Sequence, residues 1–286
     1  MTAHIIDGKV IAQNIKNQLK MKTAELKAQG KRVPCLAVIL VGNDPASEVY
    51  VGHKKKACTE VGIESRSLTL PADVNQETLS EHLRTLNADP AVDGILLQLP
   101  LPKHLQSEIA IDLISPDKDV DGLTPYSQGL LNWKRPGLTS CTPLGIMELI
   151  QSTGVDLKGK RAVVIGRSVL VGLPIAVLLG NAGATVTSIN SKTVRPDELC
   201  RDADILVVAA GVKHMVRGEW IKPGAVVIDV GIHRDGEGKK LVGDVVYEEA
   251  AKTAGWITPV PGGVGPMTIA SLLSNCMTAY QRRSQH

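Results

Sequence analysis

The sequence contains no phenylalanine, and aromatic residues make up only 2% of its 286 positions. It therefore has few rings on which nucleic-acid bases could stack. The sequence also lacks an excess of charge of either sign. Its 32 Lys and Arg residues against 29 Asp and Glu residues leave a formal net charge of +3. That balance gives no electrostatic footprint for nucleic acid or an anionic membrane. We expect neither as a partner.

Paired cysteines and long apolar runs are absent as well. The cysteines are odd in number and show no Cys-x-x-Cys spacing, which argues against a disulfide framework and predicts a reducing compartment. The first residues lack the charged-then-apolar pattern of a leader, and no apolar run reaches the roughly 20 residues of a membrane span. We therefore expect a cytoplasmic protein.

Metal-ligand spacing is missing too. The seven histidines include no His-x-x-x-His pair. Asp117, Asp119 and Asp121 alternate along the chain but lack the later glycine and glutamate of a calcium loop. The sequence predicts no metal site.

What the sequence does contain is an alternation of short apolar strands and amphipathic helices, typical of an α/β protein. The length predicts two domains, which we place at 1–120 and 140–266, with the helix from about 267–286 outside the second. The connector 115–142 is rich in Asp, Gly, Pro and Ser. Strands are expected at Cys35 to Val41, Ser65 to Leu70 and Gly94 to Leu99, and then at Arg161 to Gly166, Ala184 to Asn190, Ala203 to Ala210, Ala225 to Gly231 and Trp256 to Val260. The second series indicates a Rossmann-like parallel sheet.

The first strand of that series ends in Gly166, and Arg167, Ser168 and Gly172 follow before a predicted helix. Glycines at such a turn let phosphates approach backbone amides and the positive end of the helix, although a plain tight turn would show the same pattern. The second strand ends without the carboxylate that marks an NAD site and offers Ser191 instead. Arg167 suits a ribose phosphate, so NADP is favoured over NAD. The alternative is that Arg167 only caps a surface turn.

Two polar residues in the first half lie within apolar patterns. Lys54 shares a predicted helix face with Tyr50, Ala57, Cys58 and Val61, whereas Lys55 and Lys56 are rotated away. A partly buried lysine has a lowered pKa and can act as a base, although a run of three lysines is commonly a solvated face. Gln98 interrupts the apolar segment 94–102 at the end of a strand, where α/β proteins bind ligands, although such a residue is more often a core glutamine with satisfied hydrogen bonds.

A glycine-rich loop, Pro261 to Pro266, precedes the last helix. Gly262, Gly263 and Gly265 allow a ligand to approach the backbone closely, and the flanking prolines restrain the loop. We expect this loop to line a substrate cleft. A tight structural turn is the alternative.

Five segments, at 47–57, 94–102, 116–123, 166–174 and 259–268, resemble in order the signature motifs of the tetrahydrofolate dehydrogenase/cyclohydrolase family. The resemblance spans nearly the whole chain. It implies NADP-dependent oxidation of methylenetetrahydrofolate followed by hydrolysis of the methenyl product to formyltetrahydrofolate, in one-carbon metabolism that serves purine and amino-acid biosynthesis. It also implies a homodimer whose C-terminal helix packs back on the N-terminal, folate-binding domain.

The resemblance assigns roles to particular residues. Catalytic roles fall to Tyr50, Lys54, Gln98 and Asp121. Substrate contacts fall to Ser47, Tyr50, Asp121, Pro261, Gly262 and Gly263, and cofactor contacts to Thr142, Gly166, Arg167, Ser168, Gly172, Ser191 and Ile232. Ser127, Leu130 and Asn190 depart from the common family pattern, which bears on the dimer contacts and on cofactor affinity. Two alternatives remain open: another Rossmann dehydrogenase, such as one for shikimate-like or amino-acid substrates, and a nucleotide-binding module without catalysis.

Overall fold

The computed structural model describes residues 2–236 and 240–284, which form two units. A three-stranded unit comprises Gln13–Cys141 and Ile269–His286, and a six-stranded unit comprises Met1–Ala12 and Thr142–Thr268. The predicted limits put the first twelve residues in the other domain. They belong to the six-stranded unit because β1 (His4–Ile5) pairs in parallel with β11 (Trp256–Ile257) at the edge of its sheet.

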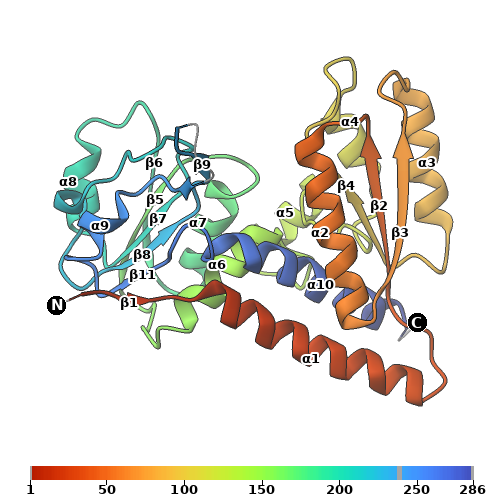
Figure 1. The fold of residues 1–286 in the computed structure, drawn as a ribbon, viewed down its shortest axis with the longest axis horizontal. Helices are drawn as coiled ribbons and strands as arrows, with labels where there is room; N and C mark the ends of the chain where they lie inside the picture. The colour runs from red at the N-terminus through yellow and green to blue at the C-terminus, as the bar shows by residue number, and fades with distance from the viewer. Residues whose placement is uncertain (1, 237–239, 285–286) are drawn as a thin grey trace. The chain divides into compact units, whose positions relative to one another are not determined.

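The three-stranded unit is a parallel sheet in the order β3–β2–β4, with β2 in the middle (Figure 1). Its strands are β2 (Cys35–Val41), β3 (Glu64–Leu70) and β4 (Gly94–Leu97), and its helices include α2 (Pro45–Val61), α3 (Gln76–Ala88), α4 (Ser107–Asp112) and α5 (Pro125–Asn132). Every residue of β2 is buried, and alternate side chains enter cores on opposite faces. One core contains residues from α2 and from α10 (Val264–Arg283), and the other contains residues from α3 and α4.

The C-terminal helix α10 packs back onto this unit as the resemblance implied. Leu272, Leu273 and Cys276 lie in the same core as Leu36 and Val38 of β2. Asn275 secures the contact, because its side-chain amide donates to the carbonyls of Val120 and Thr139 at 2.8 Å each. The long helix α1 (Gly8–Ala28) contributes Leu19 to this core.

The six-stranded unit holds an all-parallel sheet in the order β1–β11–β8–β7–β5–β6. Its other strands are β5 (Arg161–Ile165), β6 (Thr185–Ile189), β7 (Ile205–Val208) and β8 (Val226–Asp229). The flanking helices are α6 (Cys141–Gln151), α7 (Gly172–Asn181), α8 (Pro196–Arg201) and α9 (Tyr247–Ala250), with a 3-10 turn at Gly218–Trp220. The order reverses at β5, so the carboxyl edge there is a topological switch point where ligands bind.

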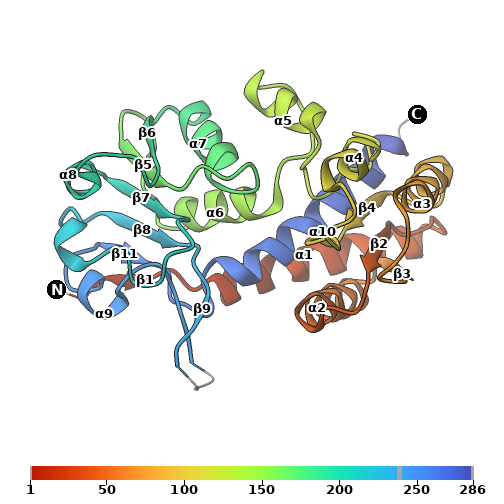
Figure 2. The same ribbon diagram turned by 90° about the horizontal axis from the view of Figure 1, so that it is seen from above.

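A separate antiparallel pair, β9 (His233–Arg234) and β10 (Leu241–Val242), extends from the carboxyl edge of this sheet (Figure 2). The residues between the two strands fall partly outside the described chain. Across the described residues, we find no helix that combines the length and apolar character needed to cross a bilayer.

Candidate active site

Lys54 and Gln98 meet in the three-stranded unit. The Lys54 Nζ donates to the Gln98 Oε1 at 2.9 Å, and the Gln98 Nε2 donates to the carbonyl of Leu99 at 2.6 Å. Gln98 follows directly after β4 and is only 9% exposed. Lys54 is partly buried on α2 whereas Lys55 and Lys56 are exposed, so the helical periodicity predicted the orientation of all three correctly.

Asp121 and Cys141 complete the electrostatic environment of this lysine. Burial lowers the pKa of Lys54, and the Asp121 carboxylate partly opposes that shift. Burial raises the pKa of Asp121, which Lys54 in turn opposes. The thiol of Cys141 donates to the carbonyl of Val120 at 3.2 Å, and burial together with Asp121 raises its pKa far above the usual range. Cys141 is not among the predicted site residues, because a lone cysteine within the connector gives no indication of the groups around it.

Tyr50 lies one helical turn before Lys54, but it is 51% exposed instead of lying on a buried face. The prediction of a continuous apolar face is wrong in the first half of α2, because beyond Ser47 the buried residues of this helix are confined to Ala57, Cys58 and Val61. Ser47 itself is buried, and its backbone N–H donates to the Asp44 carboxylate that caps the helix at 2.8 Å. Tyr50 therefore presents an exposed ring on the same helix as the lysine.

Of the three alternating acids of the connector, Asp119 bonds the backbone. The buried Asp119 carboxylate accepts from the N–H groups of Leu123 at 3.1 Å and Thr124 at 2.9 Å. These bonds use its oxygens to hold the turn that carries Asp121. In residues 2–236 and 240–284 no group of three or more His, Cys, Asp or Glu side chains is arranged as a metal site.

At the carboxyl end of β5, two glycines allow very close backbone contacts. A Cβ on Gly166, which has a φ of 107°, would lie 2.1 Å from the carbonyl oxygen of Ala209. A Cβ on Gly172 would lie 2.1 Å from the carbonyl oxygen of Gly166. Between them the Ser168 Oγ accepts from the Val171 N–H at 3.2 Å. The turn therefore leads directly into the N-terminus of α7, which is suited to a phosphate.

The neighbouring strand β6 presents no carboxylate at its end. It is followed by Asn190, Ser191 and Lys192, all exposed, and the Asn190 Oδ1 accepts from the Lys192 N–H at 3.0 Å. Asn190, one of the three departures from the family pattern, thus shapes the turn through its side chain. Arg167 is also exposed.

A cavity of about 160 Å³ in the six-stranded unit gathers residues predicted for both ligands. Ile232 from the cofactor set lines it together with Pro261, Gly262 and Gly263 from the substrate set. Lys9 also lines the cavity, although nothing in its local sequence indicated this. Thr142 lies on α6, where its hydroxyl bonds that of Thr268 at 3.0 Å.

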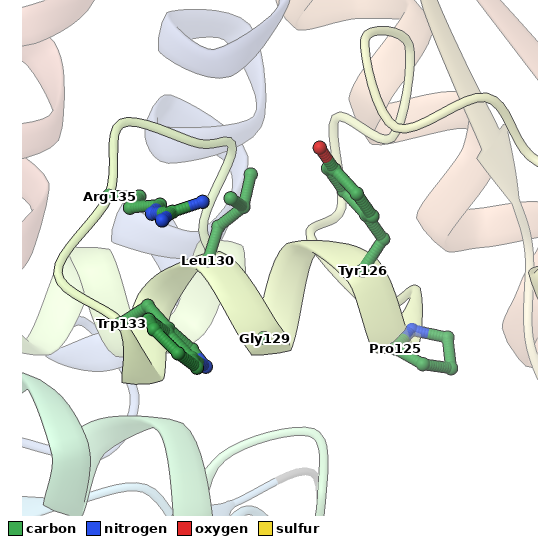
Figure 3. A pocket seen from close by; sticks show the side chains of 6 residues that line it. All are labelled: Pro125, Tyr126, Gly129, Leu130, Trp133 and Arg135. Atoms are coloured by element: carbon green, nitrogen blue, oxygen red, sulfur yellow. The ribbon is translucent and has the colours of Figure 1, made fainter.

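A second cavity, of about 350 Å³, lies along α5 in the three-stranded unit (Figure 3). Its lining includes Leu130, Tyr126 and Trp133, and the Arg135 guanidinium lies 5.3 Å from the Trp133 ring centroid. None of the predicted catalytic side chains lines it. Ser127, the other departure on this helix, is buried, and its N–H donates to the capping Thr124 Oγ1 at 3.2 Å.

Comparisons with known proteins identify the family of this chain. Residues 6–121 match the model of the tetrahydrofolate dehydrogenase/cyclohydrolase catalytic domain, and residues 140–284 match that of the NAD(P)-binding domain of the same family. A Campylobacter jejuni bifunctional methylenetetrahydrofolate dehydrogenase/cyclohydrolase is 47% identical with a TM-score of 0.96, covering 98% of this chain and 99% of that one. A Trypanosoma brucei methylenetetrahydrofolate dehydrogenase-cyclohydrolase, solved with NADP and an inhibitor, is 42% identical with a TM-score of 0.95, and each chain is covered to 100%.

A Thermus thermophilus shikimate 5-dehydrogenase is 19% identical with a TM-score of 0.53, covering 87% of this chain and 99% of that one, and it shares the fold alone. Together the two domain matches and the two relatives above 40% identity show that this chain belongs to the tetrahydrofolate dehydrogenase/cyclohydrolase family.

Proposed function

We propose that this chain oxidises methylenetetrahydrofolate with NADP and then hydrolyses the methenyl product to formyltetrahydrofolate. The observation that carries the proposal is the partly buried Lys54 held by Gln98 at 2.9 Å, which supplies a group able to move protons. Two relatives above 40% identity bear the names of both activities. The same motifs and both domains are present here.

The first reaction requires alignment more than acid-base chemistry. NADP supplies the hydride acceptor when bound. The chain's task is to hold the folate bridge against that acceptor, and positioning of this kind accounts for much of an enzyme's rate. Within the three-stranded unit we assign the folate to Tyr50, whose exposed ring can stack on the aminobenzoyl group, to Asp121, which can bond the pterin, and to Ser47. The family resemblance also gives a substrate role to Pro261, Gly262 and Gly263, which line the cavity of the six-stranded unit.

The residues at the carboxyl edge of the six-stranded sheet fit NADP. Gly166 and Gly172 leave room for backbone where any Cβ would collide, and α7 begins at the end of that turn. Arg167 and Ser191 can bond the ribose phosphate. Ser168, Ile232 and Thr142 are assigned to the rest of the cofactor.

The second reaction requires proton transfer at the attacking water and at the leaving ring nitrogen. Burial lowers the pKa of Lys54 and so raises the share of neutral amine that can accept a proton from water. The ammonium then formed can return the proton to the nitrogen. Because the Gln98 Oε1 accepts from the Lys54 Nζ, Gln98 fixes the direction of the amine.

One assay separates this function from the alternatives. The protein is mixed with methylenetetrahydrofolate and NADP, and the absorbance of the methenyl product is followed as it rises and then decays. Formation without decay would leave a dehydrogenase alone. A folded protein that binds NADP but forms no methenyl product would be a binding module, and one that reduces NADP only with shikimate-like substrates would be a different dehydrogenase.

We further propose a cytoplasmic homodimer, as the family resemblance implies. Light scattering on the purified full chain measures the mass directly. A mass of one chain, 30.4 kDa, at assay concentration would exclude the dimer.

A further inference from the structure

Asp244 is a fully buried carboxylate with a complete set of partners in the six-stranded unit. Its Oδ2 accepts from the backbone N–H groups of Ala210 and Gly211, each at 2.8 Å. Its Oδ1 lies 2.7 Å from the Nε2 of His233. The carboxylate thus joins two separate segments, the loop after β7 and the strand β9.

Both segments adjoin residues assigned to the cofactor. Ala209 comes immediately before Ala210 and Gly211, the two residues of the loop that Asp244 binds. Its carbonyl oxygen is the atom that a Cβ on Gly166 would meet at 2.1 Å. A shift of this loop would therefore alter the backbone packing around the phosphate turn. His233, on the other side of Asp244, directly follows Ile232.

A second buried carboxylate fixes Asp244 itself. Asp229, at the end of β8, accepts from the N–H groups of Gly231 at 2.9 Å, Asp244 at 3.0 Å and Val245 at 3.0 Å. The two carboxylates lie so close to the backbone that neighbouring positions must be glycine. A Cβ on Gly243 would lie 1.8 Å from the Asp229 Oδ2. A Cβ on Gly231 would lie 2.3 Å from the Asp244 Oδ1.

We propose that Asp244 is a positioning residue for NADP, which holds the loop after β7 and the His233 segment in the geometry that the cofactor requires. Asp244 does not touch the cofactor in this scheme; it acts through Gly166 and Ile232. The inference rests on the proposed cofactor site. Buried carboxylates that bond backbone amides are charge-assisted and strong, so this one is able to fix two loops at the sheet's carboxyl edge.

The test compares three variants by isothermal titration of NADP and by steady-state kinetics. Asp244→Ala removes both oxygens that bond Ala210, Gly211 and His233. We expect the dissociation constant for NADP to rise on the order of 10- to 100-fold. Asp244→Asn should restore most of the affinity, because its oxygen can accept from both amides and its Nδ2 can donate to the His233 Nε2 in the tautomer that carries no hydrogen there. In both variants the change should fall on the KM for NADP far more than on the KM for the folate.

Asp204→Ala is the matched control. Asp204 also binds a backbone amide and a side chain, accepting from the Arg161 N–H at 2.9 Å and the Lys222 Nζ at 2.6 Å. It precedes β7 and so lies at the opposite edge of the same sheet. Its loss should lower stability without changing NADP affinity, which separates positioning from general destabilisation.

The proposal is overturned if Asp244→Ala weakens NADP no more than Asp204→Ala does, or if Asp244→Asn is as impaired as Asp244→Ala. Should Asp244→Ala fail to fold, His233→Ala tests the same arrangement, because His233 is partly exposed and bonds the Asp244 Oδ1. An unchanged NADP affinity in His233→Ala would refute the proposal. Arg167→Ala, measured alongside, keeps the two ideas apart. If Arg167→Ala alone weakens NADP, the cofactor site stands and only the role of Asp244 falls; if neither does, the site assignment itself is wrong.

Discussion

Replacing Lys54 by Met separates the two proposed reactions. Methionine keeps an unbranched apolar side chain on the same face of α2, so the packing of Ala57, Cys58 and Val61 beneath it should survive. What is lost is the amine that donates to Gln98 and the positive charge that opposes the raised pKa of Asp121.

The expected loss follows from the role proposed for the amine. General acid-base catalysis contributes roughly 10²- to 10⁴-fold, which corresponds to about 3–5 kcal/mol of the barrier. Hydrolysis of supplied methenyltetrahydrofolate should fall by about that factor. Hydride transfer needs no protein base, so NADP reduction should fall less, through poorer placement of the folate.

The matched control is Lys56→Met, which removes an exposed lysine from the same helix. It should leave both rates near those of the unmodified enzyme. Stopped-flow absorbance of the methenyl chromophore measures both steps in one cuvette. A folded Lys54→Met protein that binds folate and hydrolyses the methenyl bridge at close to the original rate would refute the reasoning.

Three further predictions follow from the six-stranded unit. Arg167→Ala should raise the apparent dissociation constant for NADP much more than that for NAD. Equal effects on the two cofactors in titration would show that the guanidinium does not contact the ribose phosphate. Gly265→Ala should lower folate affinity if the loop lines the substrate cleft. The loss of stability should be small, because a Cβ at this position would meet only the Ile232 Cδ1, at 4.0 Å. Unchanged folate binding would place the loop outside the cleft. Burial raises the pKa of Asp229 to about 6 from 3.8. Between these two values the folded protein keeps a proton on Asp229 that the unfolded chain releases. The free energy of unfolding should therefore fall as pH rises from about 4 to about 6, by up to about 3 kcal/mol. Urea unfolding from pH 4 to 7 should show this loss relative to Asp229→Asn, and parallel curves would contradict the assignment.

Long apolar strands made the fold predictable. The runs at 35–41 and 162–165 lie in parallel strands and are buried throughout, and their composition is sufficient to identify them. The two-residue strand His4–Ile5 has both side chains exposed and pairs with a segment some 250 positions later, so no local pattern indicates it. The strands β9 and β10 are also only two residues long each, too short for an alternation of apolar and polar residues to indicate them.

The candidate site divides in a similar way. Helical periodicity identified Lys54, and an isolated amide in an apolar strand identified Gln98, but their contact at 2.9 Å depends on the pairing of β2 with β4. Cys141 and Asp244 gave no signal, because their importance lies entirely in the distant groups that they touch. Gly263 in the glycine loop is a poor position for a test substitution, since a Cβ there would lie 2.7 Å from the Pro259 carbonyl oxygen and would disturb the fold.

Each unit is assembled from two stretches of chain, and this sets an order of events during synthesis. The six-stranded sheet takes its edge strand β1 from the first residues and β11 from positions 256–257. The core of the three-stranded unit needs Leu272, Leu273 and Cys276. The core of the three-stranded unit therefore stays incomplete in a nascent chain until residues 272–276 have left the ribosome. Exposed apolar surface of that kind is what chaperones bind. Ribosome-bound chains that end before about residue 268 should accordingly remain sensitive to protease throughout residues 13–141, whereas the released protein should not.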